Sequence, residues 1–295
     1  MMLTIDVIVR TLADSFRSEM LFRALDSIQN QHGITARPIV VVNGESYDQR
    51  TLNALRNRPG IRFHYQQLAS AGLAFKAGCR LVTAPFFAFL DDDDVFVEDV
   101  LLKPVMWFEN NPQCDVVITN RYYVKDNGPV IEFACLADHA VQPVLSLLDE
   151  NWLSAGTGFF RTSTTIPAFM SVDKGHQEWT HLAYRLCTEG RQLHFMDVPT
   201  ALVYDTPGSM SKKMVHQEAA LDLLQLIRHD SRMDILVHKK AEFKYRNALH
   251  VLAMNYWRLG DHKRAWCCHL ASLRPPHTFK YIFFTRKLLW PFGTS

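Results

Sequence analysis

The stretch Phe86-Phe87-Ala88-Phe89-Leu90-Asp91-Asp92-Asp93-Asp94 sets an apolar run directly against four carboxylates. Five consecutive apolar residues suit a strand that is buried on both faces of a parallel sheet. Four neighbouring like charges are unfavourable unless a cation lies among them. Mn²⁺ and Mg²⁺ prefer carboxylate oxygens, so the stretch predicts a metal site at a strand end. The alternative is a solvated turn in which Asp94 caps the next helix.

Apolar runs and helical patterns alternate through the first third of the chain. Strand patterns cover 5–9, 38–42 and 62–65, and helical patterns cover 19–31, 52–57 and 72–82. This alternation predicts an α/β fold with a mostly parallel, Rossmann-like sheet flanked by helices. Ligands of such sheets bind beyond the carboxyl ends of the strands. We therefore expect the polar loops at 10–15, 43–48 and 91–94 to share one site.

The later sequence divides into a continuation of this domain and a helical extension. Further elements are expected as helices at 104–110 and 177–188, strands at 116–119 and 192–204, and a small-residue loop at 154–158. Pro199 interrupts the last of these strands. From 215 to 273 the pattern is helical and almost free of Gly and Pro, with a break at Leu259-Gly260-Asp261. We expect a domain at 1–212 and a helical extension at 213–295.

The composition excludes several protein classes. Of 295 residues, 48% are hydrophobic and 21% are charged, which suits a globular core. A net charge of +2 is too balanced for nucleic acid to be the main partner. The six cysteines form no CxxC pair, which is typical of reduced thiols in the cytoplasm.

Neither end of the chain carries a membrane-spanning pattern. No basic segment followed by an apolar one begins the sequence, and no run reaches the roughly 18 apolar residues that span a bilayer. We expect a cytoplasmic protein. The segment 279–290 mixes aromatic and cationic residues, which is typical of a helix on anionic lipid. Peripheral membrane contact is thus one interpretation, and a terminal helix packed on the protein is the other.

Four stretches resemble glycosyltransferase family 2 and occur in its order. They are 5–11, 21–31, 39–44 and 82–94, which are similar to its first strand, first helix, second strand and Asp-rich loop. The resemblance covers about residues 3–211. It implies a GT-A fold, a nucleoside diphosphate sugar as donor substrate, and Mn²⁺ or Mg²⁺ as cofactor.

The same resemblance implies roles for single residues. It places Thr11 and Leu12 against the nucleobase, Asn43 at the edge of the base, Asp91 and Asp92 near the ribose, and Asp93 on the metal. Asn43 stands where the family usually has Asp, yet an amide can still hydrogen-bond a uracil-type edge. For Thr11 and Asn43 the alternative is ordinary turn chemistry at a strand end.

An inverting transfer needs a base that deprotonates the acceptor hydroxyl. The family has an acidic pair at the start of a helix after a small-residue loop, and Gln177 and Glu178 stand there in this chain. We expect Glu178 to be the catalytic base, with His176 as a weaker candidate. The alternative for Glu178 is an acid that only stabilises the positive end of the helix dipole.

The family's closing loop resembles 203–211 but lacks its usual Arg and His. Asp205 and Pro207 stand at the nearest positions. Lys212, Lys213 and His216 follow closely and are the candidates to contact a diphosphate instead, unless they form a solvated basic loop.

These observations favour a metal-dependent inverting glycosyltransferase. It would move a sugar from a nucleoside diphosphate sugar, with a UDP-sugar favoured, to a glycan or lipid-linked acceptor. A sugar-phosphate nucleotidyltransferase would need a Gly-rich loop after the first strand, and 10–17 has no Gly. A non-catalytic nucleotide-binding or interaction protein with a partner-binding helical part stays open because of Gln177 and Pro207.

Overall fold

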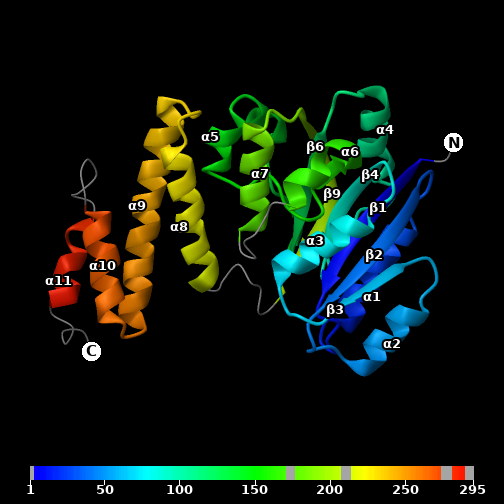
Figure 1. Cartoon of the computed structure of the whole chain (residues 1–295), viewed down its shortest axis with the longest axis horizontal. Helices are drawn as coiled ribbons and strands as arrows, with labels where there is room; N and C mark the ends of the chain where they lie inside the picture. The colour runs from blue at the N-terminus through cyan, green and yellow to red at the C-terminus, as the bar shows by residue number, and fades with distance from the viewer. Residues whose placement is uncertain (1–2, 171–176, 207–213, 274–280, 290–295) are drawn as a thin grey trace. The chain divides into compact units, whose positions relative to one another are not determined.

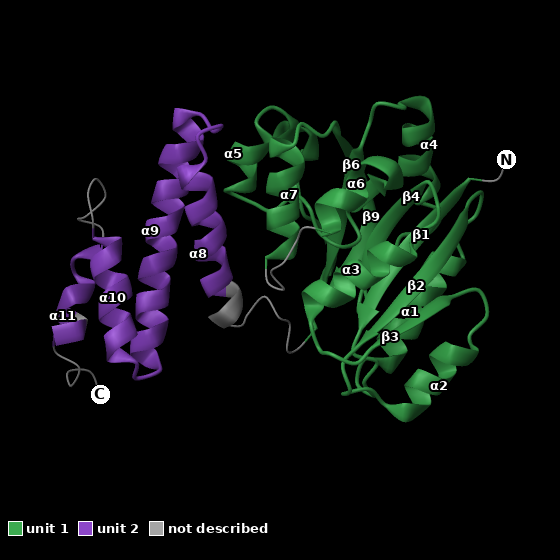
Figure 2. Cartoon of the chain, viewed as in Figure 1, with its two compact units in different colours: residues 1–209 green, residues 210–295 purple. Residues whose placement is uncertain are grey.

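The computed structural model describes residues 3–170, 177–206, 214–273 and 281–289 (Figure 1). The chain forms two compact units, residues 1–209 and 210–295 (Figure 2). The first unit has an α/β structure, and the second is helical. His176, Pro207, Lys212 and Lys213 lie outside the described residues, as does the side chain of His216.

The first half of unit 1 is a parallel sheet with alternating helices, as predicted. Its elements are β1 (Thr4–Thr11), α1 (Ser18–Gln29), β2 (Thr35–Asn43), α2 (Gln49–Asn57), β3 (Arg62–Gln66), α3 (Ala71–Leu81) and β4 (Phe86–Asp91). β1 lies between β2 and β4 and is parallel to both, and β3 adds to β2 in parallel (Figure 1). The carboxyl ends of these strands therefore meet at one edge.

The second half of unit 1 extends the same sheet beyond β4. It comprises β5 (Val95–Phe96), α4 (Leu102–Asn110), β6 (Val116–Lys125), β7 (Gly128–Ile131), η1 (Leu136–Ala140), α5 (Pro143–Leu147), β8 (Gly158–Arg161), α6 (Thr162–Met170), α7 (Glu178–Thr188) and β9 (Leu193–Tyr204). The strand order is β3-β2-β1-β4-β8-β6-β9-β5, with β7 beside β6. The antiparallel pairs are short, and β6 and β9 form a long parallel pair.

Two details differ from the sequence prediction. Pro199 does not interrupt β9; it is opposite Asn120 at a register shift, where the missing proline N–H is tolerated. The helix α6 was not expected, and it contains Pro167. Proline normally disfavours a helix interior, so this segment has no clear sequence signal.

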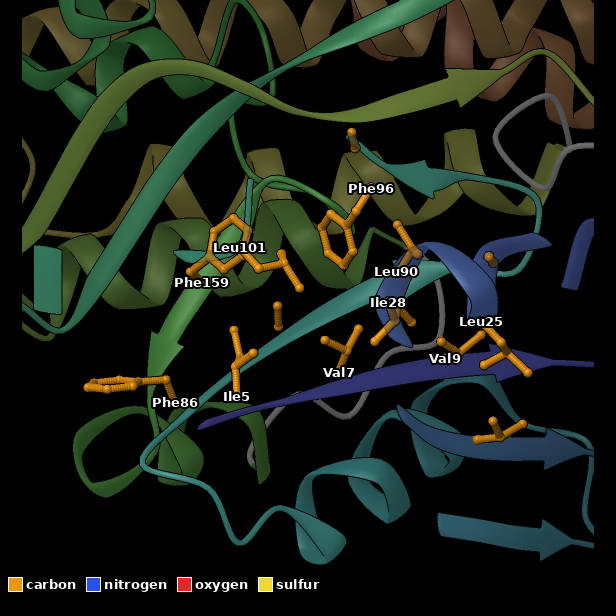
Figure 3. Close-up of a cluster of buried hydrophobic side chains, with 14 of the residues drawn as sticks. Ile5, Val7, Val9, Leu25, Ile28, Phe86, Leu90, Phe96, Leu101 and Phe159 are labelled. Atoms are coloured by element: carbon orange, nitrogen blue, oxygen red, sulfur yellow. The ribbon is translucent and has the colours of Figure 1, made fainter. Parts of the chain in front are cut away.

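The core of unit 1 explains the unbroken apolar runs. In Figure 3, Ile5, Val7 and Val9 project from one face of β1 into a cluster that includes Leu25 and Ile28 of α1. Phe86, Leu90, Phe96, Leu101 and Phe159 complete the labelled cluster. The opposite face of β1 is covered by α3, where a Cβ on Gly78 would overlap Ile8. Both faces of the strand are therefore dry, so alternate polar residues are not needed.

Asp6 is a buried charge at the amino-terminal half of β1. Its carboxylate pairs with Arg37 Nε at 2.8 Å and Arg62 Nη2 at 2.5 Å, and it accepts hydrogen bonds from the backbone N–H groups of Thr83 and Ala84. Burial raises the pKa of Asp6, but these partners outweigh it and hold the pKa below its ordinary value. The network fixes the chain just before β4.

Replacing Asp6 should destabilise unit 1. Asp6→Asn leaves two arginines without their buried counter-charge, and we expect the free energy of unfolding to fall by about 3 kcal/mol. Urea unfolding followed by circular dichroism would measure this. Asp26→Asn is the control, because Asp26 pairs with Arg58 while largely exposed and should cost less than about 1 kcal/mol. Equal losses in the two variants would contradict the assignment.

The sign of the pH dependence follows from the lowered pKa. Asp6 contributes stability above its ordinary pKa of 3.8, and that contribution is lost as the pH falls through the lower value of the folded protein. The difference between wild type and Asp6→Asn should therefore shrink below about pH 4.

Unit 2 is built from α8 (Met214–His229), α9 (Ile235–Arg258), α10 (His262–Ser272) and α11 (Phe284–Leu289). The predicted break between α9 and α10 is confirmed, with Gly260 at φ +79° and Asp261 capping α10 through Arg264 N–H. Leu252, Tyr256 and Phe284 belong to its apolar core. Thus the helical pattern predicted after residue 212 is present.

The predicted interfacial segment is only partly described. Tyr281, Phe284 and Leu288 are buried within unit 2, whereas Phe283 and Leu289 are exposed. No helix in the described part of the chain has the length and apolar character that a membrane span requires. Lipid contact by this segment remains a prediction.

Candidate functional site

The predicted polar loops meet at one edge of the sheet. Thr11 ends β1, Asn43 ends β2 and Asp91 ends β4, and β1 is hydrogen-bonded to both neighbours. Arg10 and Asp91 are opposite each other in the register of β1 and β4. The parallel topology therefore brings residues far apart in sequence to one place (Figure 1).

The four aspartates are not equivalent. The Asp92 side chain is buried and pairs with Arg17 Nη1, and it also bonds to the Thr11 hydroxyl. Burial raises the pKa of Asp92 to about 6, although Arg17 opposes the rise. Oδ2 of Asp93 lies 3.5 Å from Arg17 Nη2. Asp91 is half-exposed, and Arg10 Nη2 lies 3.9 Å from its Oδ1.

The chain's own arginines neutralise these carboxylates. Arg17 bridges Asp92 and Asp93, and Arg23 donates to the Asp93 carbonyl oxygen at 3.1 Å. Burial disfavours the charge of Arg17, but Asp92 and Asp93 outweigh it and raise the pKa of the guanidinium. The sequence analysis did not identify these partners, because nothing in the order of residues shows that the loop after β1 faces the end of β4.

Asp94 corrects a prediction, because it caps no helix. The residue is buried, and its Oδ1 accepts a hydrogen bond from the Tyr204 backbone N–H at 3.1 Å. α4 begins later, after Leu101. Burial and the neighbouring charge of Asp91 raise the pKa of Asp94 to about 8. Asp94 therefore holds the end of β9 against the aspartate loop.

The raised pKa predicts how Asp94→Asn changes stability with pH. Between about pH 4 and pH 8 the unfolded chain has lost this proton and the folded chain retains it, so wild-type stability falls as pH rises. Asn keeps the acceptor for Tyr204 but cannot ionise. We expect the melting temperature of the variant, measured in EDTA, to exceed that of wild type by several degrees at pH 8 and to approach it at pH 4. A difference that is constant over this range would contradict the prediction.

Asp91 and Asp93 are the acidic residues at this edge that could hold a divalent cation together with a ligand. Among the residues that the structure describes, no three His, Cys, Asp or Glu side chains form a metal-binding group. Asp93 and the half-exposed Asp91 are the oxygen donors that reach the open edge. Mg²⁺ is commonly held by one or two carboxylates together with substrate phosphates and water. This donor set fits a cation that arrives with a diphosphate.

Glu178 lies at the same edge through Arg10. Glu178 is the first residue of α7, and its Oε1 accepts a hydrogen bond from Arg10 Nη1 at 3.0 Å. Both side chains are mostly buried. Because Arg10 also approaches Asp91, one guanidinium links the predicted base to the strand-end carboxylates. Oε2 of Glu178 has no hydrogen-bond partner in the described part of the protein, so this oxygen can accept a proton.

An aromatic floor supports Arg10 and Glu178. The Arg10 guanidinium lies 5.2 Å from the Phe75 ring centroid and 5.9 Å from that of Phe89. Trp179 meets the same two rings edge-on at 5.5 and 5.2 Å. These contacts fix the charged pair by cation–π and packing interactions, so Trp179 has a structural role at this site.

The residues predicted to contact the nucleobase lie at the ends of β1 and β2. Leu12 is exposed, and Thr11 Oγ1 accepts a hydrogen bond from Ala13 N–H at 2.9 Å. Asn43 Oδ1 accepts from the Ser70 backbone N–H at 2.9 Å and from Gln66 Nε2 at 3.2 Å. Asn43 thus joins the ends of β2 and β3 to the start of α3.

A second buried ion pair borders the site and was missed by sequence reasoning. Arg121 of β6 binds both carboxylate oxygens of Glu132, at 2.6 and 2.7 Å, and donates to Ser154 Oγ at 2.8 Å. Ser154 opens the predicted small-residue loop, in which Gly156 has φ +78° and a Cβ would lie 2.8 Å from that of Ala201. Only glycine fits this approach.

The sequence model of glycosyl transferase family 2 matches residues 7–162, which span β1 through β8 and include the aspartate loop. The chain belongs to glycosyl transferase family 2. None of the curated proteins compared with the chain matches it.

Solved structures with the same fold include two of S. aureus TarS residues 1–349. The complex with UDP-GlcNAc is 16% identical to this chain and has a TM-score of 0.63. The match covers 92% of this chain and 81% of the TarS chain. The complex with UDP is also 16% identical and has a TM-score of 0.58. The match covers 84% of this chain and 71% of the TarS chain. With the family match, this likeness confirms the expected GT-A fold.

Proposed function

We propose that this protein transfers a sugar from a UDP-sugar to a hydroxyl group of a glycan or lipid-linked acceptor, with inversion and with a divalent cation. The observation that carries the proposal is the meeting of Glu178, Arg10 and Asp91 at one edge of a family 2 sheet. A further support is that TarS structures of this fold hold UDP and UDP-GlcNAc.

In the proposed reaction the acceptor hydroxyl oxygen attacks the anomeric carbon of the donor, and Glu178 Oε2 takes its proton. The bond from the anomeric carbon to the diphosphate oxygen breaks, and UDP leaves with that electron pair. Arg10 holds Oε1 at 3.0 Å and so orients the carboxylate toward the acceptor. Glu178 is therefore the proposed base and Arg10 a positioning residue.

The diphosphate would lie beside the aspartate loop. We propose that Asp93, together with Asp91, holds Mn²⁺ or Mg²⁺, which would stabilise the charge that develops on the departing diphosphate. Asp91 and Asp92 are also the residues proposed to lie near the ribose. Arg17, already paired with Asp93, adds a positive charge at the same place.

Exposed residues of unit 2 support an acceptor that is carried on a lipid. Exposed Ile282, Phe283 and Leu289, next to the cation Arg286, would suit peripheral contact of unit 2 with the inner face of a membrane. Such contact would bring a lipid-linked acceptor within reach of a cytoplasmic enzyme.

Nucleotide binding tests the donor part of the proposal. UDP with Mn²⁺, at a hundredfold excess over Kd, should raise the melting temperature by roughly 5–10 °C, because it binds only the folded protein. Asp93→Ala should lose the part of this shift that depends on Mn²⁺. Absence of any shift with UDP or GDP, with and without metal, would contradict the proposed function.

Replacing the proposed base tests catalysis separately. Glu178→Gln should keep the UDP–Mn²⁺ thermal shift and reduce kcat for sugar transfer or UDP-sugar hydrolysis by at least about 100-fold. Glu189→Gln is the control, because Glu189 follows the same helix and, among the described residues, forms ion pairs with Arg185 and Arg191 alone. Unchanged turnover in Glu178→Gln would remove this residue from the role of base, and no turnover in wild type would favour a non-catalytic binding protein.

A further inference from the structure

Arg17 is held at the start of α1 with its guanidinium beside the aspartate loop. Its backbone N–H donates to Asp14 Oδ1 at 2.8 Å, and its carbonyl accepts from the Leu21 N–H at 2.8 Å. The main chain of Arg17 is therefore fixed, while its side chain reaches Asp92 and Asp93, which follow β4. One positive charge is thus shared between two carboxylates.

The guanidinium holds these two carboxylates unequally. Asp92 is buried, and both Arg17 Nη1 and the Thr11 hydroxyl bind it. Asp93 is held more loosely, because 3.5 Å between its Oδ2 and Arg17 Nη2 exceeds the usual length of a hydrogen bond. Among the described residues, no second cation pairs with the Asp93 carboxylate. Arg17 can therefore release Asp93 while its Nη1 atom still binds Asp92.

A divalent cation on Asp93 would compete with this guanidinium. Both cations require the same carboxylate, and two cations so close together repel each other. The Arg17 side chain is only 24% exposed, so water would replace Asp93 poorly as its partner. The phosphates of a nucleoside diphosphate remove this conflict, because their oxygens can bind a metal ion and a guanidinium at once.

We propose that Arg17 couples the binding of the divalent cation to the binding of the diphosphate. In the ligand-free protein, Arg17 holds Asp93 as an internal counter-ion. When a nucleoside diphosphate arrives with Mn²⁺ or Mg²⁺, the cation takes Asp93, and Arg17 Nη2 turns to a phosphate oxygen while Nη1 stays on Asp92. The inference rests on the proposed function, because it assumes that Asp93 holds the cation.

This coupling has a consequence in each direction. The site does not fill with metal before its substrate is present, because Arg17 already occupies Asp93. By thermodynamic linkage, the cation must tighten the binding of the diphosphate by the same factor as the diphosphate tightens the binding of the cation. Arg17 is therefore a positioning residue, and its effect is a change in this factor.

Binding of Mn²⁺ to the full chain, measured from the electron paramagnetic resonance signal of free Mn²⁺ with and without UDP, tests the inference. Arg17→Gln should bind Mn²⁺ alone about tenfold more tightly than wild type, because no guanidinium competes for Asp93. UDP should then tighten Mn²⁺ binding about tenfold less in the variant than in wild type, because only direct contact between phosphates and cation remains. Loss of a merely structural residue would instead weaken the binding of Mn²⁺ alone.

Two further variants separate this competition from a loss of charge and from a failure to fold. Arg23→Gln also removes a guanidinium, but Arg23 reaches Asp93 only at its carbonyl oxygen, at 3.1 Å. Its affinity for Mn²⁺ should stay within about threefold of wild type. The double variant Arg17→Gln with Asp92→Asn keeps the net charge and leaves no unpaired buried carboxylate. It should still bind Mn²⁺ alone more tightly than wild type.

The results distinguish the inference from the proposed function. If Mn²⁺ alone binds no more tightly to Arg17→Gln and to the double variant than to wild type, the inference is overturned. If UDP still tightens Mn²⁺ binding to wild type in that case, the proposed function is unaffected. If wild type binds no Mn²⁺ even with UDP, the proposed metal site itself fails.

Discussion

The physical constraint on which the site depends is the cost of placing carboxylates at the end of a dry strand. β4 is buried along its length, so the aspartates that follow it enter a region where unpaired charge is unfavourable. Arginines from β1 and the loop after it meet this constraint. Arg10 forms ion pairs with Asp91 and Glu178, and Arg17 forms ion pairs with Asp92 and Asp93. The position of the predicted base is thus tied to the same electrostatics as the predicted nucleotide site.

This arrangement also explains why the neighbouring aspartates differ. The side chains of Asp92 and Asp94 are buried. Asp92 pairs with the Arg17 guanidinium and Asp94 accepts a hydrogen bond from the Tyr204 N–H, and burial raises the pKa of both carboxyl groups. Asp91 and Asp93 keep access to the edge. The turn that begins at Asp91, where Asp94 N–H bonds the Asp91 carbonyl, therefore divides a run of four identical residues into two buried side chains and two that keep some exposure.

Local pattern predicted the elements of unit 1 well, because β1 to β4 are continuous apolar runs between amphipathic helices. It also placed Thr11, Asn43 and the aspartates at one edge, since that follows from parallel strands alone. It did not predict which side chains pair. The Asp94 partner, Tyr204, is 110 residues away, and the Glu178 partner, Arg10, is 168 away. Such pairs depend on register and on loop geometry, and a helix with an internal proline such as α6 has no local signal. The chemical roles of these residues remain predictions.

The contact between Gly78 and Ile8 has a consequence for how the protein can vary. α3 approaches β1 so closely there that no side chain can be added on the helix. The first turn of the same helix supplies the Ser70 N–H that orients Asn43. Substitutions at these two positions would therefore disturb the protein on different scales. A change at Asn43 would disturb only the contact between the ends of β2 and β3 and the start of α3, whereas any enlargement at Gly78 would push the whole helix away from β1.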